Sequence, residues 1–170
     1  RGFKKFIPKD LAFEIEGVSA GAKVPRSFVY LINYFDDLFR IRLQQCSGFV
    51  FKDGGGNYEM AINLDYGIML KELMRNCIFR HTWCPTPFLS VGSPGYIGII
   101  RGMNAEGVAL GYFTSHASDV KKPGLPQSLW LRQILSGKFA DFESVASELM
   151  IGPRTIGSNV LVCSKNKAAA

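Results

Sequence analysis

The stretch QQCSGFVFKDGGGNYEMAINLDYG, residues 44–67, contains two strand-like runs around a glycine-rich turn. The runs CSGFVFKD and YEMAINLDY are typical of strands, and Gly54–Asn57 supplies residue types that adopt the positive φ angles of tight turns. We therefore expect a β-hairpin with Cys46 at the head of its first strand and Asp65 near the end of its second. Helical patterns precede this stretch, so it marks a change of architecture.

Upstream of the hairpin the sequence predicts two helices, over residues 8–24 and 25–39. Apolar residues recur at roughly helical spacing in both segments. Pro8 and Pro25 suit the first turn of a helix, and Gly21 is a candidate end signal for the first one.

Downstream, strands and helices are predicted in blocks. Strands are expected within 77–83, 86–93, 95–102, 107–115 and 158–165, and helices within 127–139 and 141–152. Residues 67–76 are ambiguous, and Asp141 is a plausible N-cap. Ala168–Ala170 is expected to be a stub that leaves the last strand without a return partner. The pattern indicates an α+β organisation, an antiparallel sheet layered with helices.

Composition favours one folded domain. The chain has 170 residues, 47% of them hydrophobic, and no apolar run approaches the roughly 18 residues of a membrane span. Twenty basic and 14 acidic residues give a net charge of +6, scattered in small clusters. This distribution argues against nucleic-acid binding, which needs a concentrated basic stripe. It is compatible with attraction to anionic substrates or a peripheral membrane surface.

The cysteines and histidines do not form a recognisable metal motif. Cysteines occur at positions 46, 77, 84 and 163, with no CxxC pair, and the histidines are His81 and His116. No metal site is expected from these spacings. A Cys77–Cys84 disulfide and two buried thiols both remain open, as do a cytoplasmic and a secreted or lysosome-like location.

Cys46 has a distinct chemistry if it becomes the first residue of a mature chain. A free α-amine has a pKa of about 7.7 to 8 and a thiol about 8.5, so the amine can serve as base for its own side chain. Asp65 could orient that amine, as the third group of a catalytic triad does. Before cleavage the thiol would attack the Gln45 carbonyl and form a thioester that water resolves. The structural alternative is a buried thiol, with Asn63 and Asp65 capping backbone groups.

These residues resemble the nucleophile hairpin of cysteine N-terminal-nucleophile (Ntn) hydrolases. The motif CSGFVFKDGGGN…INLDY is similar to that of the acid ceramidase and N-acylethanolamine-hydrolysing acid amidase branch. Choloylglycine hydrolases and penicillin-type acyltransferases are more distant. The upstream EIEGVSAGAKVPRSFVYLINYFDDLF resembles the helical prosegment of that branch. The resemblance implies an αββα Ntn fold, with residues 1–45 as a helical propeptide and 46–170 as the N-terminal part of the catalytic domain.

The resemblance also implies site residues. Cys46 matches the nucleophile, released by autocleavage after Gln45. Asp65 matches the aspartate that contacts the cysteine, and Asn63 is its supporting neighbour. Phe113 falls near the position whose backbone N–H contributes to the oxyanion hole.

Three departures from the family pattern affect these expectations. Most hydrolase relatives have an arginine where this chain has Ile62, whereas acyltransferase relatives lack it. Several relatives have a polar side chain at the position of Phe113. The asparagine that completes the oxyanion hole is expected beyond residue 170, so we expect an incomplete chain whose own C-terminal part would complete the site. Tyr66 and Ile62 are expected to contact substrate.

The leading hypothesis is a self-processing amidohydrolase that cleaves a linear, non-peptide C–N amide bond of an N-acyl lipid or N-acyl amine. No cofactor is expected, and a homo-oligomer is compatible with the sequence. The alternatives are an acyltransferase of the penicillin-acyltransferase type and a non-catalytic or unprocessed relative that acts by binding. Ile62 favours the last of these, whereas intact Cys46 and Asp65 oppose it.

Overall fold

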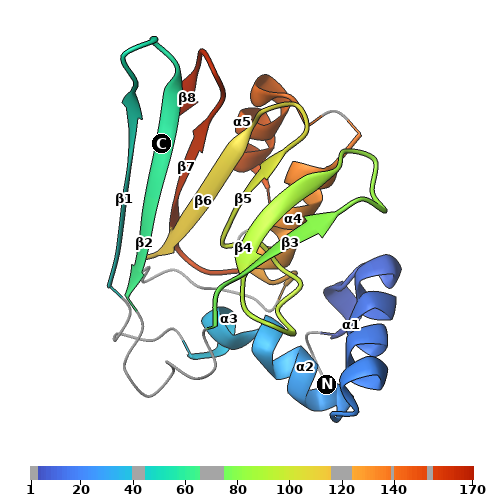
Figure 1. Cartoon of the computed structure of the whole chain (residues 1–170). Coiled ribbons are helices and arrows are strands. Elements are labelled where there is room, and N and C mark those ends of the chain that lie inside the picture. The colour runs from blue at the N-terminus through green and yellow to red at the C-terminus, as the bar shows by residue number, and fades with distance from the viewer. Residues whose placement is uncertain (1–3, 40–44, 66–74, 116–123, 139, 153–154) are drawn as a thin grey trace.

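The structure, a computed structural model, combines helices with antiparallel sheets (Figure 1). It describes residues 4–39, 45–65, 75–115, 124–138, 140–152 and 155–170. The helices are η1 (Lys4–Phe6), α1 (Lys9–Ala22), α2 (Arg26–Asn33), α3 (Phe35–Phe39), α4 (Gln127–Ser136) and α5 (Phe142–Ile151). The strands are β1 (Gln45–Lys52), β2 (Tyr58–Asp65), β3 (Cys77–His81), β4 (Phe88–Gly92), β5 (Arg101–Asn104), β6 (Ala109–Thr114), β7 (Ser158–Cys163) and β8 (Ala168–Ala169). The expected α+β class is confirmed.

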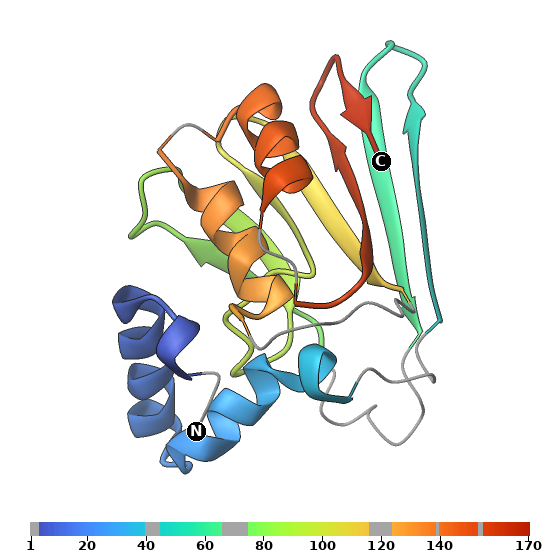
Figure 2. The ribbon, with the colours of Figure 1, turned by 180° about the vertical axis from the view of Figure 1, so that it is seen from behind.

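The strands form two sheets. β1 and β2 make the predicted hairpin, in which Cys46 lies opposite Leu64 and Gln45 lies opposite Asp65. The other six strands form one antiparallel sheet in the order β3-β4-β5-β6-β7-β8. The connection from β6 to β7 contains α4 and α5, which cover one face of this sheet (Figure 2).

The hairpin packs on the opposite face of the six-stranded sheet. On β6, Leu110 and Tyr112 join the core beneath the helices, so the alternation of the strand directs Gly111 and Phe113 to the other face. There a Cβ atom added at Gly111 would lie 1.8 Å from Cδ1 of Ile62. The absence of a Cβ at Gly111 thus leaves room for the end of the Ile62 side chain. The described residues form three layers: helices, sheet and hairpin.

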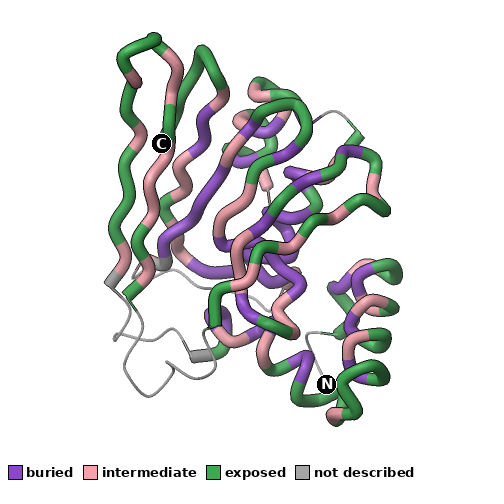
Figure 3. The backbone as a smooth tube through the Cα atoms, in the orientation of Figure 1, coloured by how far each residue is buried: buried purple, intermediate pink, exposed green. Residues whose placement is uncertain are grey.

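The helical segment, residues 4–39, packs against the end of the sheet and against α4 (Figure 1). Its buried residues share a second core with two residues from downstream, Ile97 and Leu129. Helix α4 accordingly has buried residues around most of its circumference, because it lies between the sheet and the helical segment. Figure 3 shows the resulting band of buried backbone through the sheet and α4.

Several predicted boundaries are wrong in detail. The first helix ends at Ala22 instead of Gly21, with Lys23 in the left-handed conformation (φ 55°). The predicted helix over 25–39 is two helices, because the chain turns at Tyr34. In the hairpin turn, Gly56 is the residue with positive φ (80°). The ambiguous segment 67–76 lies mostly outside the described residues.

Two further corrections concern strands. Ala168–Ala169 is not a stub: it forms β8 and pairs with β7 through a turn in which the Ser164 N–H donates to the Lys167 carbonyl (2.8 Å). The strand expected within 95–102 begins only at Arg101. No helix among the described residues is both long and apolar enough to cross a membrane.

Candidate nucleophile site at the start of strand β1

Cys46 occupies the second position of β1, at the open end of the hairpin. Directly opposed residues of an antiparallel pair share one face of the sheet. Its partner Leu64 packs against the main core, so the Cys46 thiol belongs to the face of the hairpin that meets the six-stranded sheet. The side chain is half-buried, which leaves it partly accessible.

The environment of Cys46 disfavours its thiolate. Burial raises the pKa of the thiol, and the negative charges of Asp36 and Asp65 raise it further. A hydrogen bond from the Asp65 backbone N–H acts in the opposite direction and lowers that pKa. The thiol is therefore mainly protonated near neutral pH, and a nucleophilic role for it requires a general base.

Asp65 and Asn63 lie on the other face of the hairpin from the Cys46 thiol. They alternate with Leu64 along β2, and both are exposed. The Asn63 amide Nδ2 donates to the Asp65 carboxylate (2.9 Å), so the two side chains act together. The strand register brings Asp65 beside Gln45 and therefore beside the Gln45–Cys46 peptide bond.

Phe113 lies within β6, opposite Asn159 of β7, and is buried. Its ring faces Gly48, where an added Cβ would lie 2.3 Å from Cζ of that ring. The Ile62 side chain likewise packs against Gly111 of β6. Both side chains hold the hairpin against the sheet, and an arginine at position 62 would have to leave this apolar contact.

Two buried carboxylates near the site are absent from the sequence-based expectations. Asp36 accepts a hydrogen bond from the hydroxyl of Tyr112 (2.6 Å), and Asp37 accepts one from the hydroxyl of Thr155. Asp37 also accepts from the backbone N–H of Gln127 (3.3 Å) at the start of α4, where the helix dipole favours an anion. A pair of acidic residues within the apolar run YFDDLF was the available signal.

The Asp37 carboxyl makes stability depend on pH. Burial raises the pKa of Asp37 from 3.8 to about 6, against the lowering effect of its hydrogen bonds. Because the folded chain holds this proton more tightly than the unfolded chain, stability is lost as pH rises from about 4 to above 6. We expect Asp37→Asn, which keeps an acceptor oxygen, to raise the free energy of unfolding at pH 7.5 by up to about 3 kcal/mol.

The measurement is urea-induced unfolding at pH 4 and pH 7.5. The gain should fall below about 1 kcal/mol at pH 4, where Asp37 is protonated in the folded chain and partly protonated in the unfolded chain. Glu106→Gln is the matched control because Glu106 is exposed in a turn, and it should change little at either pH. A larger increase in the free energy of unfolding at pH 4 than at pH 7.5 would contradict the raised pKa of Asp37.

The remaining expected groups fall into two sets. Tyr66 lies outside the described residues, so its contact with substrate stays a prediction. All four cysteines are free thiols, Cys77 and Cys84 included. No cluster of three or more potential metal-ligating side chains occurs in the described part of the chain.

A cysteine at the head of a hairpin, with that hairpin and a helical layer on opposite faces of an antiparallel sheet, is the arrangement of a cysteine Ntn hydrolase. The sequence model of the acyl-coenzyme A:6-aminopenicillanic acid acyl-transferase family matches residues 53–170. The chain belongs to this family. The match begins after Cys46, so the candidate nucleophile lies outside the matched residues.

Two known proteins resemble this chain over part of their length. Acid ceramidase of Balaenoptera acutorostrata scammoni is 26% identical over 111 residues, which cover 56% of this chain and 27% of the ceramidase. The Caenorhabditis elegans N-acylethanolamine-hydrolyzing acid amidase ortholog has a similar fold, with a TM-score of 0.56 and 16% identity over 73% of this chain. The match spans 57% of that structure. The expected family resemblance is confirmed.

Proposed function

We propose that this chain belongs to a self-processing cysteine amidohydrolase whose mature catalytic chain begins at Cys46. The observation that carries the proposal is the position of Cys46. It lies on the face of the hairpin that meets the six-stranded sheet, in the first strand after the helical segment. The thiol would attack the Gln45 carbonyl carbon, and the C–N bond would break as the Cys46 nitrogen takes a proton. Water would then hydrolyse the thioester, which leaves Gln45 with a carboxylate and Cys46 with a free thiol beside its free amine.

That amine would supply the base that the precursor thiol lacks. With a pKa of about 7.7 to 8, roughly a tenth of it is unprotonated at pH 7 and able to accept a proton. Asp65, beside the cleavage position and held by Asn63, would orient the resulting ammonium. The backbone at Phe113 is our candidate for stabilising the oxyanion of the tetrahedral intermediate.

The substrate we propose is a linear N-acyl amide, of an N-acyl lipid or N-acyl amine. Support comes from the two relatives, one a ceramidase and the other an N-acylethanolamine-hydrolyzing amidase. The thiolate would form an acyl-enzyme with release of the amine, and water would release the acid. No cofactor takes part in this sequence of steps.

Acyl transfer is the second candidate, because the matching family is named for it. The same acyl-enzyme would then react with an amine acceptor instead of water. Ile62, packed against Gly111, is compatible with this alternative because acyltransferase relatives also lack the arginine. A non-catalytic relative is the third candidate, and an uncut chain would favour it.

The test uses full-length protein incubated with an N-acylethanolamine or an N-acylsphingosine, with and without a second amine. Mass spectrometry would follow the fatty acid, the released amine and any new amide. Equal amounts of acid and amine support hydrolysis, and a new amide supports transfer. The absence of all three products, from a chain whose Gln45–Cys46 bond is cut, would overturn both enzymatic candidates.

A further inference from the structure

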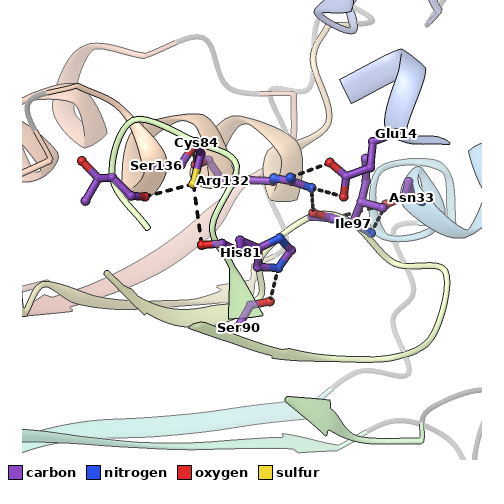
Figure 4. Close-up of polar contacts among 10 residues, drawn as sticks. Glu14, Asn33, His81, Cys84, Ser90, Ile97, Arg132 and Ser136 are labelled. Atoms are coloured by element: carbon purple, nitrogen blue, oxygen red, sulfur yellow. Dashed lines mark hydrogen bonds and ion pairs between the residues drawn. The ribbon is translucent and has the colours of Figure 1, made fainter. Parts of the chain in front are cut away.

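The helical segment is attached to the rest of the protein through buried polar contacts. Glu14 of α1 forms a two-pronged ion pair with Arg132 of α4 (2.6 and 2.9 Å), and Arg132 also donates to the Ile97 carbonyl (Figure 4). Asn33 of α2 accepts from the Ile97 N–H (2.8 Å) and donates to the Gly95 carbonyl (2.8 Å). Such contacts fix geometry more narrowly than apolar packing does.

Helix α3 has two such contacts although it contains only five residues. The Tyr112 hydroxyl donates to Oδ2 of Asp36 (2.6 Å), and the Tyr96 hydroxyl donates to the same oxygen over a longer distance (3.4 Å). Oδ1 of Asp37 accepts from Thr155 and from the start of α4. Asp36 and Asp37 are only 5% and 7% exposed, so water competes little for these hydrogen bonds.

The position of α3 limits where β1 can begin. Five residues, 40–44, separate the end of α3 from Gln45. Six peptide steps reach at most about 20 Å, so an anchored α3 restricts the entry of the chain into β1. Tyr112, the partner of Asp36, adjoins Phe113 in β6, and the ring of Phe113 faces Gly48 of β1, two residues after Cys46. Beside burial, the charge of Asp36 also raises the pKa of the Cys46 thiol.

We propose that α3 anchors the cleavage site, with Asp36 as a positioning residue that holds the Gln45 carbonyl in reach of the Cys46 thiol. This inference rests on the proposed self-cleavage. Attack of a thiol on the preceding carbonyl needs the two atoms about 3 to 3.5 Å apart and aligned, and a displacement of 1 Å can cost a hundredfold in rate. Asp36 acts here through its hydrogen bond to Tyr112, without touching the reacting atoms.

Positioning and electrostatics predict opposite results at Asp36. Its charge disfavours the Cys46 thiolate, so a purely electrostatic role predicts that Asp36→Ala and Asp36→Asn both accelerate cleavage. Positioning predicts that Asp36→Ala slows cleavage at least about tenfold. Asp36→Asn keeps an acceptor oxygen for Tyr112 and should cleave at the wild-type rate or faster. Tyr112→Phe removes the closer of the two hydroxyl donors and should slow cleavage in the same direction as Asp36→Ala.

The experiment follows the appearance of the Cys46 N-terminus in freshly purified full-length protein by intact mass. Glu14→Ala is the matched control, because it removes the partly buried ion pair by which α1 contacts the same interface. It should weaken the interface without slowing cleavage. Thermal unfolding of each variant should show a folded protein, and alkylation of Cys46 should show a reactive thiol. A lower cleavage rate in such a variant then reflects a change in the position of the Gln45 carbonyl relative to the thiol.

Three results would overturn the inference. Wild-type rates in both Asp36→Ala and Tyr112→Phe would exclude the anchor while leaving self-cleavage intact. An equal loss in Glu14→Ala would show that general weakening of the interface, not α3, sets the rate. A wild-type chain that never cleaves would remove the proposed function and this inference together. Slow cleavage in Asp36→Ala together with wild-type or faster cleavage in Asp36→Asn supports the positioning role of Asp36.

Discussion

Cys46→Ala is expected to abolish cleavage of the Gln45–Cys46 bond and all amide turnover. Alanine removes the sulfur that would form the thioester, and its methyl group cannot act as a nucleophile in that step. The remaining rate should lie at least about 10⁴-fold below the wild-type rate, as for other enzymes that lose their nucleophile. Intact mass and N-terminal sequencing would show one uncut chain, and no fatty acid would be released.

The other thiols provide the controls for this result. Cys84 is half-buried and donates to the Thr86 carbonyl (3.2 Å), and Cys77 lies in β3 at the far edge of the six-stranded sheet. Cys77→Ala and Cys84→Ala should therefore process and turn over substrate normally. If Cys46→Ala protein were still cut before residue 46, the nucleophile would have to be sought elsewhere.

Asn104→Ala is expected to be the most destabilising of the substitutions considered. Asn104 is 4% exposed, and its side chain makes four hydrogen bonds around the β5–β6 turn. Its amide donates to the carbonyls of Leu135 (3.1 Å) and Ala140 (2.7 Å), and its oxygen accepts from the amides of Glu106 and Val108. Alanine would leave these groups without their partner.

The expected loss is about 3 kcal/mol, since each buried group left unpaired costs about 1 kcal/mol or more. For a chain of this length that corresponds to a fall of about 10 °C in Tm. Calorimetry or thermal circular dichroism would measure it. Asn159→Ala, at an exposed position of β7, should shift Tm little. Comparable shifts in both variants would show that the network contributes no special stability.

The hairpin could be predicted from the sequence because its signals are local. Alternating residues and a glycine-rich turn lie within one continuous stretch, and the strand register follows from them. The same locality placed Cys46 at the head of β1 and Asp65 near the end of β2. The N-cap at Asp141 was also correct, since its partner, the Ser144 N–H, lies only three residues away.

Contacts between distant segments account for what the sequence could not predict. The strand expected from residue 95 starts late because the Asn33 side chain accepts from the amides of Ile97 and Gly98. The partners of Asp36 and Asp37 lie on β6, α4 and the segment before β7, far along the chain. Adjacent aspartates in a helix look solvated until the fold brings donors to them.

Helix α4 has a consequence for the order of events during biogenesis. Leu129 is fully buried in the core shared with the helical segment, and Arg132 points to Glu14 of α1. A chain synthesised from residue 46 onward would expose an apolar stripe and an unmatched cation along α4. If the proposed self-cleavage takes place, the segment before Cys46 would serve as an internal template, and folding would have to come before the cut.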